Sequence, residues 1–467
     1  MTRLSTSRVC LLAAASLIFL HYTTSVFRPF TDSLGFSRVT TASTKAGTCS
    51  PHDWADGHWE HRPRPRVPGV NDTVMTDRND IFKYNGLQGC ASDREFHWHL
   101  RADNEGLYDR FPDVTEYVWV PSSKCTGVDP LTPQGLIKHL VEEGSWLVLG
   151  DSVTENHFFS LSCTLFPHVR ATPNYTENPY FDRAWPQHLY LNPNSPIVKD
   201  LDMPGGFDIA ETPLVTFRRM DLLLTKPELE ALHKAKHPEM YANGDFVLFG
   251  DEQDWNRSPA EYFEWFTAPA PFRYATLITN TGGHWHPNLL QGLKDEEAEG
   301  QGIRAVLQFF GEAMEYWAHE AQAYMDNIRV KEEAEQLQIA GLGGAGRKGA
   351  VKQLRREVIV RGYTPGHEDC HMERAPWDVF HPEIAFRWRW FNWAWIHSDM
   401  NEIFEKILAS PRYPDLHFLR IENPALLRPD AHGPSDCLHL MSGSGVLESF
   451  THYIWHYVSK ELPSGAP

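Results

Sequence analysis

Short, continuous apolar runs recur along the chain, and helical patterns lie between several of them. The runs occupy residues 146–149, 246–249, 275–278, 358–360 and 417–421. A run that is apolar at successive positions, instead of at alternate ones, is typical of a strand that is buried on both faces. The pattern therefore predicts strands in the interior of a sheet.

Amphipathic helices are predicted where apolar residues recur at intervals of three or four. The clearest segment covers residues 303–328, and shorter ones cover 400–408 and 447–458. Strands that alternate with helices favour a three-layer α/β fold, in which a mostly parallel sheet has helices on both faces. In such a fold, ligands bind beyond the carboxyl ends of the strands. We assign this domain to residues 131–467.

Residues 49–130 follow a different pattern. They are rich in Pro, Gly, Asp and Trp, contain three cysteines and show no long helical periodicity. Across the whole chain, six cysteines lie outside the N-terminal apolar segment, and no Cys-x-x-Cys pair occurs. Up to three disulfides are therefore expected, with their pairing left open. We expect residues 49–130 to form a loop-rich N-terminal subdomain stapled by disulfides.

The first residues are typical of a secretory signal. Arg3 and Arg8 precede an apolar stretch at 9–20 that continues, less purely, to residue 27. The shortness of this stretch favours a cleaved signal, whereas the lack of a small-x-small cleavage site favours a type II anchor. We expect a signal anchor or signal peptide at 1–27 and a Ser- and Thr-rich stem at 28–48. Glycosylation sequons at Asn71, Asn174 and Asn256 are compatible with a lumenal location.

The charge balance narrows the range of partners. The formal net charge is −18 at pH 7, which argues against nucleic acid or an anionic membrane surface as the main partner. We expect membrane attachment only through the N-terminal segment.

Polar clusters follow two of the predicted strands and precede the last helix. They are Gly150-Asp151-Ser152, Asn280 to His286, and Asp436 to His439. Taken separately, each has a structural reading as a helix cap, a turn or a surface imidazole. Taken together across an α/β pattern, they favour a serine acyl-transfer site.

Each predicted role follows from the chemistry of acyl transfer. A serine hydroxyl needs a base, and histidine suits that task because it titrates near neutral pH. We therefore predict Ser152 as the nucleophile, His439 as the base and Asp436 as the group that orients the imidazole. Backbone and amide donors must hold the oxyanion. The predicted oxyanion or substrate-binding residues are Gly150, Asp151, Asn280, Gly283 and His284, with Gly205 and Gly206 as candidates for a further donor.

Closely spaced histidines also suggest metal binding. The three pairs are His97 with His99, His284 with His286, and His367 with His371. Histidines flanked by aromatic residues more often pack or cap loops, and acyl transfer needs no metal. We expect no metal at the catalytic site.

The same motifs resemble those of a known family. Residues 150–163 look like the Gly-Asp-Ser block of the PC-esterase or trichome birefringence-like family, whose members are SGNH/GDSL-type acyl-esterases and polysaccharide O-acetyltransferases. Residues 280–285 are similar to its Asn-Thr-Gly-His-Trp block, and 430–439 to its Asp-x-x-His block; the resemblance covers about 85–460. The chain departs from the plant pattern at Glu155, where an Arg is usual, at 440–445, and in an insertion at 337–352.

The resemblance implies an SGNH-like fold and a lumenal enzyme of the secretory pathway, on a Golgi-type single-pass type II anchor, with a secreted form as the alternative. It implies serine-dependent O-acyl, in the first place O-acetyl, transfer to a polysaccharide or glycan through an acyl-Ser152 intermediate. No bound cofactor is expected, and the acyl donor would be acetyl-CoA or an acetylated carrier. Two alternatives stay open: a carbohydrate acetylesterase with the same residues, and a non-catalytic glycan-binding or scaffold protein on a degenerate SGNH fold.

Overall fold

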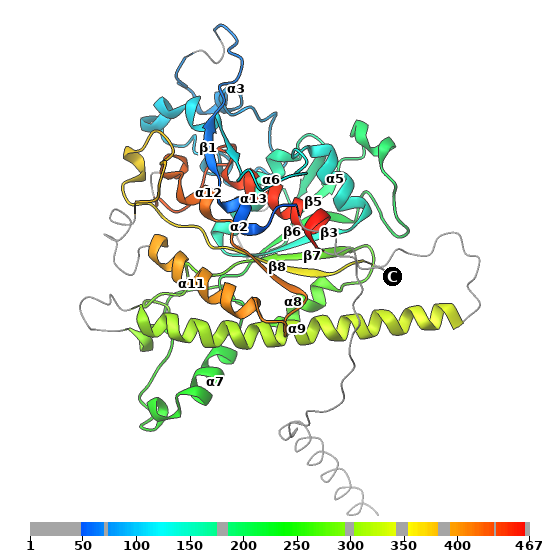
Figure 1. The fold of residues 1–467 in the computed structure, drawn as a ribbon, viewed down its shortest axis with the longest axis vertical. Coiled ribbons are helices and arrows are strands. Elements are labelled where there is room, and N and C mark those ends of the chain that lie inside the picture. The colour runs from blue at the N-terminus through cyan, green and yellow to red at the C-terminus, as the bar shows by residue number, and fades with distance from the viewer. Residues whose placement is uncertain are drawn as a thin grey trace, which may run out of the picture. The chain divides into compact units, whose positions relative to one another are not determined.

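A seven-stranded sheet lies at the centre of the computed structural model, which describes residues 48–69, 73–174, 185–294, 303–341, 354–381, 393–433 and 436–462 (Figure 1). The strand order is β4-β5-β6-β3-β7-β8-β9. The five strands from β6 to β9 are parallel neighbours, while β4 and β5 pair antiparallel. The strands are β3 (Ser145–Gly150), β4 (Val169–Thr172), β5 (Gln187–Leu191), β6 (Pro213–Arg219), β7 (Tyr274–Thr279), β8 (Glu357–Arg361) and β9 (Leu416–Leu419).

The central strands are buried on both faces, as their continuous apolar runs predict. Every residue of β3, β7 and β8 is buried. Along β3, Leu147 and Leu149 enter one core, whereas Trp146 and Val148 enter the other. This alternation is the period of two that a strand imposes on its side chains.

Helices cover both faces of the sheet (Figure 1). One layer holds α5 (Pro133–Glu142), α6 (Ser152–Thr164) and α13 (Val446–His456); the other holds α8 (Pro259–Phe266), α9 (Arg304–Gly341) and α11 (Trp393–Leu408). The predicted three-layer α/β architecture with a mostly parallel sheet is therefore confirmed. Two further helices are α7 (Lys226–Lys236) and α12 (Asn423–Leu426), and a π-helical turn (Tyr457–Glu461) follows α13.

The predicted helical pattern at 303–328 is α9. Its apolar positions at intervals of three and four form a buried stripe that includes Val306, Phe310, Met314 and Trp317. Phe310 and Trp317 both pack edge-on against Phe404 of α11, so the two helices share one core.

The N-terminal part is built from short elements and disulfides. Its elements are α2 (Pro51–Ala55), β1 (His58–His61), α3 (Ile81–Asn85), α4 (Phe96–His99) and β2 (Tyr117–Val120), of which β1 and β2 pair antiparallel. Cys49–Cys125 closes this part on itself, and Cys90–Cys163 fastens it to α6. A third disulfide is Cys370–Cys437. Three disulfides are thus present, and the described residues belong to one compact unit.

The strand predictions differ from the structure in two ways. Residues 246–249 are not a strand: Leu248 is buried, but Val247 is 66% exposed, and the segment forms backbone hydrogen bonds with the turn at 289–292 instead of joining the sheet. Conversely, the pattern missed three strands of the sheet, β4, β5 and β6. In β6, which lies beside β3, Thr216 and two arginines interrupt the apolar run. Thr216 is accommodated by a 2.6 Å hydrogen bond with the Tyr274 hydroxyl, and Arg218 by the face of Trp265.

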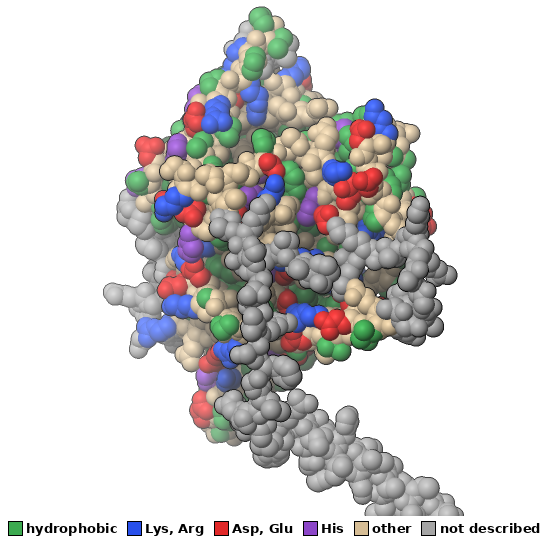
Figure 2. Space-filling model, turned by 45° about the vertical axis from the view of Figure 1, so that its right-hand side comes forward, with side chains coloured by type: hydrophobic (Ala, Val, Ile, Leu, Met, Phe, Trp, Pro, Cys, Tyr) green, Lys and Arg blue, Asp and Glu red, His purple; other side chains and the backbone are tan. Residues whose placement is uncertain are grey.

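Several predictions fall outside the described residues: the signal segment at 1–27, the stem up to residue 47, residues 342–352 of the insertion, and the sequon at Asn71. Within the part of the chain that is described, no helix combines the length and the apolar run needed to span a bilayer. Asn174 is exposed, and the Asn256 amide donates to Asp254. On the face seen in Figure 2, acidic and basic side chains are interspersed.

Candidate active site

Ser152 lies at the carboxyl end of the central strand β3, in the first turn of α6. Asp151 is the N-cap, and its Oδ1 accepts a 3.0 Å hydrogen bond from the Val153 N–H. Its Oδ2 accepts one of 2.9 Å from the Tyr363 hydroxyl, so both carboxylate oxygens hold the turn. The N–H of Ser152 belongs to the first helical turn, whose amides the helix itself does not satisfy and whose dipole favours negative charge.

Three predicted catalytic residues form one hydrogen-bonded line. His439 Nε2 lies 2.7 Å from Ser152 Oγ, and His439 Nδ1 lies 2.6 Å from Asp436 Oδ2. A carboxylate only accepts hydrogen bonds, so Nδ1 carries the proton and Nε2 is left to accept from the Ser152 hydroxyl. This is the arrangement in which a histidine removes a serine proton.

The charge of Asp436 is stabilised in place. Burial alone would raise the pKa of this carboxyl. The hydrogen bond from His439 and the charges of His439 and Arg101 lower the pKa by more than burial raises it, so the pKa lies well below its ordinary value. The N–H groups of Leu438 and His439 also donate to Oδ1, at 3.0 and 3.1 Å. Asp436 is therefore ionised throughout the neutral range.

The loop that carries His439 is fixed from several directions. The Cys370–Cys437 disulfide holds it two residues upstream. Asn156 of α6 accepts from the Leu440 N–H at 3.0 Å, which ties the loop to the helix that begins with Ser152. These contacts join two segments separated by almost three hundred positions.

Asn280 follows β7 and lies beside the nucleophile turn. Its Oδ1 accepts a short hydrogen bond from the Thr154 hydroxyl, while its Nδ2 is buried and has no hydrogen-bond partner within the described part of the chain. A Cβ at Gly150 would lie 2.7 Å from Asn280 Oδ1 and closer still to Thr154, so only glycine fits there. Asn280 is 1% exposed and is not among the residues that line the cavity, but a buried amide donor without a partner is what an oxyanion site requires.

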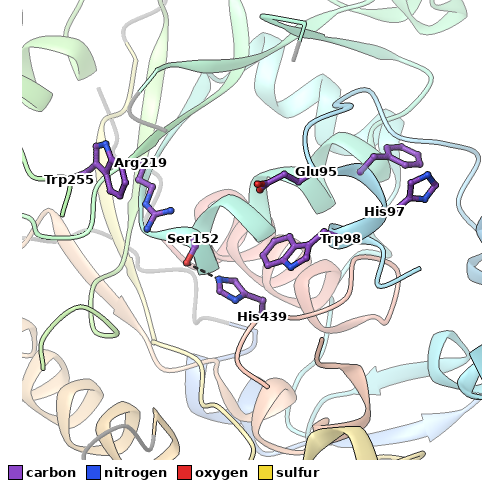
Figure 3. Close-up of a pocket in the computed structure, with 8 residues that line it drawn as sticks. Glu95, His97, Trp98, Ser152, Arg219, Trp255 and His439 are labelled. Carbon is purple, nitrogen blue, oxygen red and sulfur yellow. Dashed lines mark hydrogen bonds between the residues drawn. The ribbon is translucent and has the colours of Figure 1, made fainter. Parts of the chain in front are cut away.

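A cavity of about 710 Å³ opens beside Ser152 and His439 (Figure 3). Arg219 and Trp255 lie to one side of the serine, and Glu95 and Trp98 to the other. The Trp98 ring lies 4.9 Å from the His439 ring, and the buried guanidinium of Arg101 stacks on Trp98 at 4.1 Å. The lining residues are Glu95, Phe96, His97, Trp98, Ser152, Arg219, Trp255 and His439.

Arg219 is positioned by a buried acid. Its Nε donates to Asp221 Oδ1 at 2.9 Å, and its guanidinium lies 4.7 Å from the Trp255 ring centroid. Burial raises the pKa of Asp221 more than His284 and Arg219 lower it. Arg219 was not predicted because β6 was not predicted. Ligands bind at the carboxyl ends of such strands, so recognising β6 would have pointed to Arg219.

Not every predicted site residue lines the cavity. The backbone of Gly283 hydrogen-bonds to the Tyr363 hydroxyl, and His284 contacts Asp221 at 3.4 Å, so both lie behind the cavity wall. Asp151 is occupied in capping. Gly205 and Gly206 precede β6, whereas the cavity borders its other end, at Arg219. The geometry gives these residues no contact with an oxyanion.

Glu155, which departs from the family pattern, is neutralised within the chain. It is buried and forms a 2.7 Å ion pair with Arg94, and Gln187 donates to it at 2.8 Å. Arg94 thus places a positive charge near the start of α6. In the family pattern, that charge comes from an Arg at the position of Glu155.

Of the three histidine pairs, one converges with a carboxylate. One ligand atom each from Glu252, His284 and His286 lies within 4.8 Å of the other two. His99 instead bonds to Asn156 at 2.8 Å, and His367 to His432 at 2.7 Å.

The resemblance to the PC-esterase family remains a prediction from the motifs. Neither models of known protein families nor curated proteins match this chain.

Proposed function

We propose that the protein is a serine-dependent O-acyltransferase that acts on a glycan or polysaccharide. The observation that carries the proposal is the unbroken line from Asp436 through His439 to Ser152, with contacts of 2.6 and 2.7 Å. A serine in the first turn of a helix needs no such partner, so this line argues against a merely structural role and against a degenerate site.

In the first half-reaction, Ser152 Oγ attacks the carbonyl carbon of an acyl donor while His439 Nε2 takes the hydroxyl proton. The resulting oxyanion accepts hydrogen bonds from the Ser152 N–H and Asn280 Nδ2. Its collapse breaks the bond to the leaving group, which receives the proton from His439. The products are acyl-Ser152 and the free donor alcohol or thiol.

In the second half-reaction, His439 removes a proton from an acceptor hydroxyl, which attacks the acyl-serine. The tetrahedral intermediate collapses, the Ser152 oxygen leaves, and the proton returns to it. The aromatic faces of Trp98 and Trp255 on the cavity wall suit the apolar face of a sugar ring.

The proposal also includes the acyl donor. Acetyl-CoA or an acetylated carrier would enter as a co-substrate, with no bound cofactor. The three disulfides fit an oxidising compartment, in line with a lumenal enzyme on a Golgi-type anchor.

The test is acyl transfer from an activated acetyl ester, with and without a glycan acceptor. We expect acetylated glycan from the wild type and from the exposed-serine control Ser459→Ala, and none from Ser152→Ala. Free acetate as the sole product would favour a carbohydrate acetylesterase with the same residues. Undiminished turnover by folded Ser152→Ala would exclude the mechanism.

A further inference from the structure

A cluster of two imidazoles and a carboxylate lies behind the cavity wall. His284 and His286 belong to the turn after β7, and Glu252 comes from the segment that precedes α8. Trp285, between the histidines, is buried in the core on the α9 side and donates to Thr281 at 3.0 Å, which fixes the turn.

The spacing of the polar atoms is wider than that of ordinary hydrogen bonds. His286 Nε2 lies 3.3 Å from Glu252 Oε1, whereas N–H···O contacts are commonest at about 2.9–3.0 Å. Two ligands on a tetrahedral ion with bonds of about 2.0–2.1 Å are separated by about 3.3–3.4 Å. His284 Nδ1 is also buried without a hydrogen-bond partner in the described part of the chain.

Glu252 forms no ion pair with a lysine or arginine in the described part of the chain, although the charge of Lys226 also acts on it. Asp221 pairs with Arg219, and Asp254 pairs with Lys226. The ion-pair partner of Glu252 is the imidazole of His286. A bound cation would neutralise the Glu252 carboxylate.

We propose that Glu252, His284 and His286 bind one Zn²⁺ ion. Two imidazole nitrogens and a carboxylate oxygen suit this borderline cation, and its lack of redox chemistry suits a disulfide-bearing, oxidising environment. The ion's role is structural: it joins the segment that carries Trp255 to the turn that begins with Asn280. Trp255 is already hydrogen-bonded to Asp221 through its N–H and its carbonyl, so the ion would stiffen one wall of the cavity.

A second cluster serves as the control. His61, Asp113 and Glu116 also converge, but Arg66 donates to both carboxylate oxygens of Glu116 at 2.8 Å, and the Arg64 N–H donates to one of them at 3.0 Å. This carboxylate is satisfied without an ion.

The experiment measures zinc bound per chain, by elemental analysis and by calorimetric titration of the chelator-stripped full-length protein with Zn²⁺. We expect one equivalent, a higher Tm with Zn²⁺, and no change in either for His61→Ala. In Glu252→Gln, which keeps the side-chain shape at a half-exposed position, affinity should fall by more than the roughly 10–100-fold typical of losing an outer partner of a metal ligand.

His286→Ala is the second variant and should lose the zinc-dependent rise in Tm. The proposal is overturned if folded wild-type protein binds no zinc saturably, or if Glu252→Gln and His286→Ala bind zinc as the wild type does. Because no acyl transfer is measured, this outcome is independent of the reaction at Ser152.

Discussion

The two sides of the cavity are held in different ways. On the proposed catalytic wall, formed by Ser152 and His439 with Asp436 and Asn280 behind them, the Asp436, His439 and Ser152 side chains hydrogen-bond to one another at 2.6 and 2.7 Å. On the recognition wall, formed by Arg219 and Trp255, one buried acid holds the guanidinium and leaves its outer face and the indole toward the cavity (Figure 3). The first arrangement suits bond making, and the second suits holding a substrate. Substitutions on the first wall should therefore lower kcat, and substitutions on the second should raise KM.

The largest effect is expected for His439→Ala. Without a base for Ser152, the rate of acyl transfer should fall about 10⁴–10⁶-fold. Steady-state kinetics with an activated ester measure it, and His319→Ala, an exposed histidine on α9, is the matched control. A loss below about tenfold in folded protein would remove His439 from the mechanism.

Asp436→Asn should lower kcat about 10⁴-fold, because an amide no longer fixes the tautomer in which His439 Nε2 is a free acceptor. His439→Ala and Asp436→Asn combined should be little worse than His439→Ala alone, since the two groups act as a unit. An additive double variant would contradict this coupling.

Asp436→Asn should also change how the unfolding free energy depends on pH. The folded-state pKa of Asp436 lies below its ordinary value of 3.8, so its charge stabilises the fold above that pH, and the stabilisation is lost as the pH falls further. The difference in unfolding free energy between wild type and Asp436→Asn should shrink as the pH falls below about 4. Denaturant titrations across this range measure it; a difference that grows in acid would contradict the assignment.

Asn280→Ala should lower kcat about 10²–10³-fold with little change in KM, the effect of losing one oxyanion donor. Thr154→Val, which removes the hydroxyl that orients the Asn280 amide, should give a smaller loss in the same direction. A rise in KM with unchanged kcat would show that Asn280 contributes to substrate binding instead of catalysis.

The smallest effect is expected on the recognition wall. Trp255→Ala should raise KM for a glycan acceptor about tenfold, or about 1.4 kcal/mol, and should change the KM for a small ester much less. Kinetics with both substrates decide this, and equal changes would show that Trp255 does not distinguish acceptors.

The same contrast explains which features of the fold and the site could be predicted from the sequence. The strand before Ser152, the helix after it, and Asn280, Asp436 and His439 were predicted because each lies in a local pattern: a continuous apolar run, a cap or an Asp-x-x-His spacing. The three-layer architecture followed from the same periodicities. Local patterns thus predicted both the core of the fold and the residues to which we assign the chemistry.

Arg219, Trp255, Trp98 and Thr154 were not predicted, because their positions depend on packing between distant segments. Arg219 could be recognised as a site residue only once β6 was known. The polar side chains of β6 contact side chains of other elements, which the local sequence does not show. The assignment of 246–249 as a strand was wrong for the same reason, since pairing with the turn at 289–292 outweighs its apolar composition. Arg94, which neutralises Glu155, likewise comes from a distant part of the chain.

The central claim is tested most directly by trapping the acyl-enzyme. Brief reaction with an activated acetyl ester, an acid quench and peptide mapping by mass spectrometry should place one acetyl group on Ser152 in the wild type, and no acetyl group on that peptide in Ser152→Ala. Acetylation of other residues only, with turnover intact in the Ser152→Ala variant, would contradict the account.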